Sequence, residues 1–127
     1  MRKTKKMMKK TFIIACLLFA CGVTFGQIAE KQTYLSDFKE EMKKKWPTNR
    51  TLNIVFHGHS VPSGYFHGGV VNTMQAYPHL TFHGIKAQYP FTVLNVITTS
   101  IGGEQAEQGE KRFSDEVLTH RPDVLFI

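Results

Sequence analysis

The sequence predicts an α/β domain built on a parallel sheet with crossover helices. Three short runs rich in β-branched and aromatic residues, at 51–57, 91–98 and 123–127, are typical of strands. Two segments with helical character, at 73–88 and 104–120, separate these strands. Strand, helix, strand, helix, strand in this order indicates parallel strands whose connecting helices cover the sheet.

A further helix is expected before the first strand, over residues 33–46. Four apolar residues recur there at helical spacing, on one side: Leu35, Phe38, Met42 and Trp46. Pro47 is expected to end this helix. We therefore divide the chain into residues 1–26, a helix and linker at 27–50, and the sheet domain at 51–127.

The two helical segments between the strands differ in strength. Residues 73–88 are weakly helical, because Pro78 and Gly84 interrupt them. Residues 104–120 are a clearer helix with acidic residues in its first turn, and Glu104 is expected to cap or begin it. Its expected inner positions are Ala106, Phe113, Val117 and Leu118.

The net charge of +6 is concentrated at the N-terminus. Six of the 16 basic residues lie in the first ten positions, and the others balance the 10 acidic residues. No basic face for a phosphate backbone remains in the rest of the chain, so we expect no nucleic-acid partner.

The basic stretch precedes a short apolar segment, residues 11–26. This segment is shorter than the ~20 residues of a spanning helix, and small residues precede Gln27. Residues 1–26 are therefore predicted to be a signal peptide, which makes the protein secreted or periplasmic with no stable membrane span after cleavage. Two alternatives stay open: an uncleaved membrane anchor, and a lipid anchor on Cys21, because "LFAC" at 18–21 is similar to a bacterial lipobox.

Both cysteines, Cys16 and Cys21, lie in this segment. A chain cleaved before Gln27 would have no cysteine, so we expect no disulfide, no thiol nucleophile and no cysteine-bound metal.

Glycine-rich turns follow the first two strands, at 58–64 and 102–103. The carboxyl ends of parallel strands meet at one edge of a sheet, so these turns should lie together. Ser60, at the tip of a strand-to-helix turn, can expose its hydroxyl beside backbone N–H groups. Gly103, at the mouth of a helix, lets the backbone approach a ligand closely. Serine and glycine are also ordinary turn residues, and that simpler interpretation stays open for Ser60.

The same stretches resemble a known family. "GHSVPSGY", at 58–65, resembles the first block of the SGNH (GDSL-type) hydrolases, usually Gly-Asp-Ser-Leu-x-x-Gly. "VITTSIGGEQAEQG", at 96–109, resembles their second block, and "VLTHRPDVLFI", at 117–127, is similar to the helix end and strand that follow. The resemblance covers residues 51–127 and implies a three-layer α/β/α fold (SGNH/flavodoxin-like), truncated after the third strand.

By position in these blocks, Ser60 corresponds to the catalytic nucleophile, and its backbone N–H to one oxyanion donor. Gly103 corresponds to the second oxyanion donor. The third donor (an asparagine side chain), the base and its orienting acid belong to blocks that lie beyond residue 127. Three positions depart from the family pattern: His59 replaces an aspartate, Val61 a leucine and Ser100 a common glycine.

The family's Gly-x-Asn-Asp and Asp-x-x-His blocks are absent from these 127 residues. We therefore expect the coding sequence to continue past Ile127. The 127-residue chain alone, with an unpaired apolar sheet edge, is expected to be inactive and poorly folded.

The resemblance implies an exported serine esterase that hydrolyses carboxylic esters through an acyl-enzyme, with no cofactor. Candidate substrates are small-molecule or carbohydrate esters, including acyl or acetyl groups on carbohydrates. The alternative from another class is a non-catalytic glycan-binding module on the same scaffold.

A metal-dependent hydrolase is a further alternative, because the chain has 6 histidines, two of them at His57 and His59. In a strand, these two side chains would share one face. No carboxylate lies at close metal-ligand spacing and no His-Glu-x-x-His motif occurs, so no metal site is predicted. His57 is expected to be a packed or substrate-facing ring, and no histidine is assigned as the base.

The N-terminal pattern yields a test by intact mass. The exported protein should begin at Gln27 and carry no disulfide, because signal peptidase cleaves after small residues. Mass spectrometry of the protein from its native compartment measures this directly. A diacylglyceryl group on Cys21 would show that the lipid-anchor alternative is correct instead.

Overall fold

The computed structural model describes residues 28–127. Residues 35–127 form one compact unit, and residues 28–34 belong to another. The signal-peptide prediction and its alternatives fall on residues 1–26 and so lie outside the described part of the chain. Within that part, no helix has both the length and the apolar character needed to cross a membrane.

Three parallel strands form the sheet, in the order β2-β1-β3. The central strand β1 (Thr51–Phe56) pairs along its whole length with β2 (Val93–Thr98), and over three residues with β3 (Val124–Phe126). The parallel sheet predicted from the sequence is confirmed. All three strands point their carboxyl ends toward the same edge.

Every second side chain of the central strand points to the same packed face of the sheet. Leu52, Ile54 and Phe56 have 1 % or less of their surface exposed. The Phe56 ring stacks on Phe126 at 4.7 Å between centroids and meets Tyr77 edge-to-face at 5.3 Å. Burying one such side chain stabilises the fold by roughly 1.5–3 kcal/mol, so the middle strand anchors the core.

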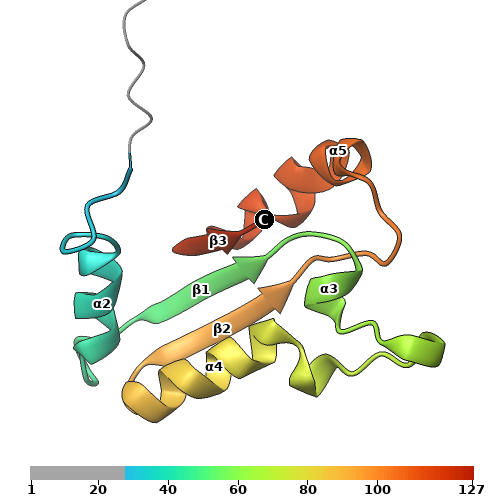
Figure 1. The fold of residues 1–127 in the computed structure, drawn as a ribbon. Helices are drawn as coiled ribbons and strands as arrows, with labels where there is room; N and C mark the ends of the chain where they lie inside the picture. The colour runs from blue at the N-terminus through green and yellow to red at the C-terminus, as the bar shows by residue number, and fades with distance from the viewer. Residues whose placement is uncertain (1–27) are drawn as a thin grey trace, which may run out of the picture. The chain divides into compact units, whose positions relative to one another are not determined.

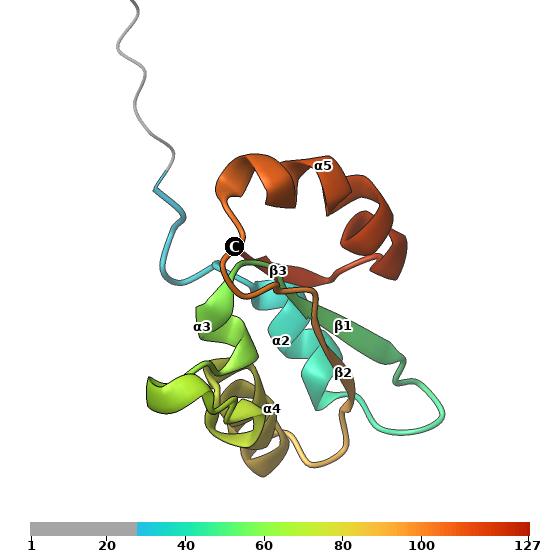
Figure 2. The same cartoon turned by 90° about the vertical axis from the view of Figure 1, so that its right-hand side faces the viewer.

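Helices cover both faces of the sheet (Figures 1 and 2). The short α3 (Ser60–Ser63) and α4 (Tyr77–Gln88) lie on one side, and α5 (Ala106–Glu116) lies on the other. The three-layer α/β/α class is therefore confirmed. Pro78 does not interrupt α4, because it lies in the first turn, where no intrahelical N–H is needed.

The helix α2 (Ser36–Lys43) is shorter than predicted. Met42 is buried as expected, but Trp46 lies beyond the helix and is 85 % exposed. The placement of Trp46 on the packed side was therefore wrong. A residue that precedes proline disfavours the helical conformation, and Trp46 precedes Pro47.

The predicted inner positions of the last helix need a partial correction. Val117 is fully buried and Phe113 is half-buried, whereas Ala106 and Leu118 are exposed. The α-helix ends at Glu116 and a 3₁₀ turn, η3 (Leu118–His120), follows. This change of pitch takes Leu118 off the helical stripe that the sequence pattern assumed.

The start of β3 is held to β1 by Asp123. Its carboxylate accepts hydrogen bonds from the backbone N–H of Asn53 at 2.8 Å and from Arg50 at 2.7 Å. Burial alone would raise the pKa of Asp123, but these two hydrogen bonds and the Arg50 charge lower it below its ordinary value. The interaction lies at the amino ends of the strands, at the opposite edge from the predicted site.

Candidate functional site

The turns after β1 and β2 lie side by side at the carboxyl edge of the sheet. Beyond the strand ends, the N–H of Thr99 donates to the carbonyl of Phe56 at 2.9 Å, and the N–H of Ile101 donates to that of Gly58 at 3.1 Å. The parallel ladder thus continues into both turns. The expectation that these two stretches meet at one edge agrees with this geometry.

A pair of serine hydroxyls adds a side-chain link between the turns. The Oγ atoms of Ser63, at the end of α3, and Ser100 are 2.7 Å apart. Ser100 stands where the resembled family commonly has a glycine, and here its hydroxyl holds the helix that Ser60 begins. This link fixes the orientation of α3 against the second turn.

Ser60 is the first residue of α3 and is half-buried. Its Oγ lies 3.2 Å from Nδ1 of the neighbouring His59. The His59 ring is exposed, and no described residue binds its other ring nitrogen. A general base needs both contact with the nucleophile and an orienting partner, so this histidine meets the first requirement and not the second.

Gly103 lies in a tight turn in which the N–H of Glu104 donates to the carbonyl of Ile101 at 3.2 Å. Its φ of +80° is a conformation that favours glycine. A Cβ built on it would meet no atom within 4 Å, so the protein itself leaves the space beside this residue open. Within residues 28–127, the N–H groups of Ser60 and Gly103 donate no hydrogen bond and so remain available to a ligand.

The neighbouring Gly102 is required for a different reason. A Cβ there would lie 2.7 Å from the ring of Tyr65, a distance that real Cβ atoms do not reach. The backbone N–H of Tyr65 donates to the carbonyl of Ser60 at 3.1 Å. Tyr65 therefore contacts both turns, through its backbone on one side and its ring on the other.

Glu104 follows the glycine turn and pairs with Arg112 on α5. The two side chains are 9 % and 12 % exposed, and the guanidinium donates to both carboxylate oxygens. These hydrogen bonds lower the pKa of Glu104, against the opposing effect of burial. The expectation that Glu104 caps the helix was wrong: Gln105 is the N-cap and exchanges hydrogen bonds with Gln108.

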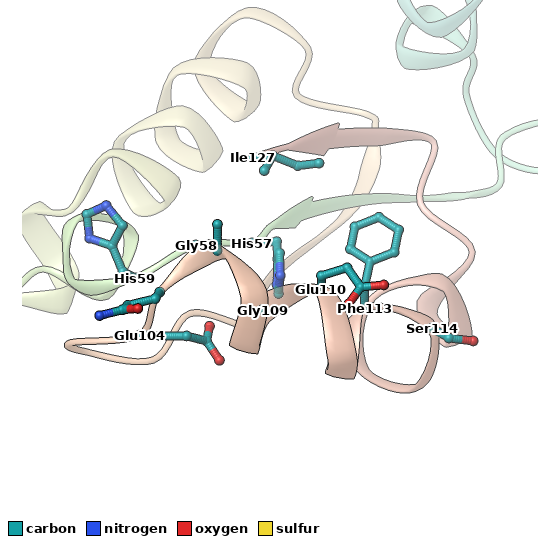
Figure 3. Close-up of a pocket in the computed structure, with 11 residues that line it drawn as sticks. His57, Gly58, His59, Glu104, Gly109, Glu110, Phe113, Ser114 and Ile127 are labelled. Carbon is teal, nitrogen blue, oxygen red and sulfur yellow. The ribbon is translucent and has the colours of Figure 1, made fainter.

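His57 is a packed ring at the end of β1, with 5 % of its surface exposed. Its Nδ1 lies 2.9 Å from the hydroxyl of Thr99, and Phe113 meets it edge-to-face at 5.6 Å. Its Nε2 would lie 3.1 Å from a Cβ on Gly109, so α5 approaches the ring closely (Figure 3). The packed interpretation of His57 agrees with these contacts, and the ring also lines the cleft beside α5.

A cleft of about 510 Å³ lies between these residues and α5 (Figure 3). His57, Gly58 and His59 contribute from the first turn, Glu104 from the second, and Phe113 from the helix. One of its lining residues, His59, directly precedes Ser60 in the chain. The cleft is therefore suited to hold part of a ligand that contacts the serine hydroxyl. In the described part of the chain, no three His, Cys, Asp or Glu side chains lie close enough to hold a metal ion.

Comparison with known proteins bears on the fold. No family model matches the chain, and no curated protein sequence does. Among solved structures, it resembles a two-domain esterase (CEX) active on acetylated mannans, with 23% identity and a TM-score of 0.60 over 72% of this chain and 24% of the other. A lipase/acylhydrolase from Enterococcus faecalis also matches, with 27% identity and a TM-score of 0.45 over 58% of this chain and 36% of the other.

The likeness to the mannan esterase agrees with the sequence blocks at 58–65 and 96–109. The chain has an SGNH-type hydrolase fold. It spans 24% of the length of that esterase. Ser60 and Gly103 lie in adjacent βα turns of this fold.

Three contacts of the site were not predicted from the sequence: the serine pair at 63 and 100, the Tyr65 ring on Gly102, and the buried Glu104–Arg112 pair. Each joins residues that lie between eight and 37 positions apart in the chain. The only local sequence feature that could have indicated one of these contacts is the double glycine at 102–103. One glycine accounts for the positive φ, and the second indicates that another group packs closely against the turn.

The Glu104–Arg112 pair predicts how stability depends on pH. Because the folded chain lowers the pKa of Glu104, the pair stabilises the fold above the ordinary carboxyl value of 4.5, and this stabilisation is lost as the pH falls through the lower folded value. Glu104→Gln should therefore reduce the loss of melting temperature between about pH 5 and pH 3. Thermal unfolding of the full-length protein, monitored by circular dichroism, measures this.

The matched control is Glu107→Gln, because Glu107 pairs with Lys111 while remaining 80 % exposed. Exposed pairs contribute little, so this change should leave the acid limb of the profile unaltered. Equal acid limbs for wild type and Glu104→Gln would contradict the role given to the buried pair.

Proposed function

We propose that this chain carries the nucleophile and two oxyanion donors of an exported serine esterase that hydrolyses carboxylic esters. The observation that carries the proposal is the junction of the two turns: the hydrogen bond from Ile101 to Gly58 places the Ser60 and Gly103 loops together. The SGNH-type fold supports it, because the resembled family uses a serine and a glycine at these positions.

The chemistry assigned to the chain is acyl transfer. The Oγ of Ser60 attacks the ester carbonyl carbon and passes its proton to a general base, which the family resemblance assigns to a block outside residues 1–127. That base protonates the departing alcohol as its C–O bond breaks, and a covalent acyl-serine forms. Water then attacks the acyl carbon, the bond to Ser60 Oγ breaks, and the carboxylic acid leaves with the serine hydroxyl restored. The N–H groups of Ser60 and Gly103 donate to the oxygen on which negative charge develops, and one such donor is typically worth about 3 kcal/mol.

The substrate is proposed to be an acylated or acetylated carbohydrate, and a small-molecule ester is the broader class. Acetylated mannans, on which the structurally similar esterase acts, are the first substrates to test. No metal or organic cofactor takes part in this scheme, and the protein is proposed to act outside the cytoplasm after removal of residues 1–26.

In the full-length enzyme, Ser60→Ala should abolish hydrolysis of 4-nitrophenyl acetate while leaving the melting temperature unchanged. Alanine keeps the turn but has no hydroxyl to acylate. Ser36→Ala, on α2 at the surface, is the matched control and should retain full activity. His59→Ala should have a smaller effect than Ser60→Ala, because no described group orients its ring.

The alternatives make opposite forecasts for the same assay. A Ser60→Ala protein that keeps its rate and loses it to a chelator would make the metal-dependent hydrolase correct. A wild-type protein that binds acetylated oligosaccharides without any turnover would support the glycan-binding module instead.

Gly103→Val should lower kcat by about 100-fold, the effect of losing one oxyanion donor. A branched side chain at φ +80° is strained, so the turn would rearrange and carry its N–H away from the site. The structure thus adds a conformational reason to the crowding that a Cβ would cause against a bound substrate. Gly84→Val, also in open space but on α4, controls for the added volume.

A kinetic comparison of the two valine variants on the same ester decides this point. Unchanged kcat in Gly103→Val, with the fold retained, would remove Gly103 from the oxyanion site.

A further inference from the structure

A second groove, of about 340 Å³, opens on the other side of the nucleophile turn. We call it the hairpin groove, and its main lining residues are Val61, Tyr65, Phe66, Asn72, Gln75 and Tyr77. It begins at the residue that follows Ser60. It is separate from the cleft beside α5, with which it shares no lining residue.

The walls of the hairpin groove are held by backbone hydrogen bonds. Residues 65–71 form a small hairpin in which Phe66 donates to the carbonyl of Val70 at 2.8 Å, and Asn72 donates to that of Gly64 at 2.8 Å. A Cβ at Gly64 would lie 2.6 Å from the Asn72 carbonyl oxygen, so only glycine fits this approach. The groove is therefore preformed, which lowers the entropy cost of binding.

The groove is joined directly to the predicted reaction site. Tyr65 donates its N–H to the carbonyl of Ser60, and its ring lies against Gly102 beside the proposed oxyanion donor. A molecule seated on Tyr65 therefore lies beside the turn that carries Ser60. This position suits one half of an ester whose carbonyl is at Ser60.

The lining combines exposed aromatic rings with free amides. Tyr65, Phe66 and Tyr77 are 52 %, 71 % and 37 % exposed, although burying such aromatic rings would stabilise the fold. The side-chain amides of Asn72 and Gln75 make no hydrogen bond within residues 28–127. The groove thus offers flat apolar faces together with unused donors and acceptors.

We propose that the hairpin groove binds a sugar ring of the substrate, with the alcohol half of the ester seated there and the acyl half directed to the cleft beside α5. This inference rests on the proposed function. A sugar ring has C–H faces that can cover aromatic rings and hydroxyls at its edge that can bond to amides. Phe66 provides the stacking surface and Gln75 a hydrogen-bonding partner.

An aliphatic acyl chain is a poorer occupant of this groove. It would cover Asn72 and Gln75 without supplying hydrogen-bond partners, and buried polar groups left unpaired are costly. The cleft beside α5, lined mostly by apolar surface, suits an acyl group better. The two halves of an ester thus match the two hollows on either side of Ser60.

The test, made on the full-length protein, compares a sugar ester with an ester that lacks both a sugar and an aromatic ring. The probes are acetylated mannobiose and 2,2,2-trifluoroethyl acetate. Phe66→Ala should lower the ratio of their kcat/KM values by roughly tenfold, the usual loss for an aromatic anchor. Phe66→Tyr should restore the ratio, because it keeps the ring.

Phe91→Ala is the matched control. Phe91 is also a surface phenylalanine, 54 % exposed, but it lies before β2 at the opposite edge of the sheet. This variant should keep the wild-type ratio and both rate constants.

Binding is measured separately from turnover, by calorimetry with mannotriose on Ser60→Ala protein. Adding Phe66→Ala or Gln75→Ala should weaken that binding, and Phe91→Ala should not. If the wild type hydrolyses no ester but mannotriose binding still depends on Phe66, the proposed function fails and the groove assignment stands. Binding and ratio that are both insensitive to Phe66 would overturn the assignment, as would a Phe66→Ala defect that appears only with longer acyl chains.

Discussion

The hydrogen bond from the N–H of Ile101 to the carbonyl of Gly58 is the constraint on which the site depends. It extends the β1–β2 ladder beyond the last paired residues, so the two turns keep the register of the sheet. The net value of one such bond is only about 1 kcal/mol. Its importance is geometric, because the preceding strand β1 buries Leu52, Ile54, Val55 and Phe56 and cannot shift without disturbing the core. The serine pair at 63 and 100 adds a second link, so that α3 and the glycine turn move together.

The second turn is held from the opposite face by a different interaction. The carboxylate of Glu104 is bound by two nitrogens of Arg112, which also contacts Glu116. Removing two charges from water is costly, and a bidentate pair with further hydrogen bonds offsets most of that cost. The pair therefore fixes the position of Glu104 in addition to its pH-dependent contribution to stability. It ties the residue after Gly103 to the middle of α5, while Tyr65 contacts Gly102 from the α3 side. The glycine turn is thus confined between the two helical layers.

The parallel sheet and the meeting of the two turns could be predicted, because they follow from local patterns. Runs such as residues 51–57 carry the strand signal within a few positions, and parallel order follows from the alternation of elements. The contacts inside the site could not be predicted, since each joins residues distant in the chain. Glu104 shows the limit. An acidic residue before a helix is a common cap. Glu104 instead pairs with Arg112, which lies eight residues later in the chain and is brought next to it by the fold. The prediction that Leu118 is an inner position failed for a similar reason, because the helix changes pitch after Glu116.

His59 and Ser100, which differ from the pattern of the resembled family, both contact residues of the short helix α3. In the resembled family, an aspartate precedes the nucleophile and a glycine is common in the second block. Here His59 contacts the Ser60 hydroxyl through Nδ1, and Ser100 holds the end of the helix that Ser60 begins. An imidazole carries no negative charge, whereas a carboxylate beside the serine would oppose the charge that develops on the oxyanion. A glycine at position 100 would leave the backbone freer, whereas the hydroxyl of Ser100 makes a fixed contact with Ser63. Both departures affect the same short helix, one through the charge beside Ser60 and the other through the orientation of the helix.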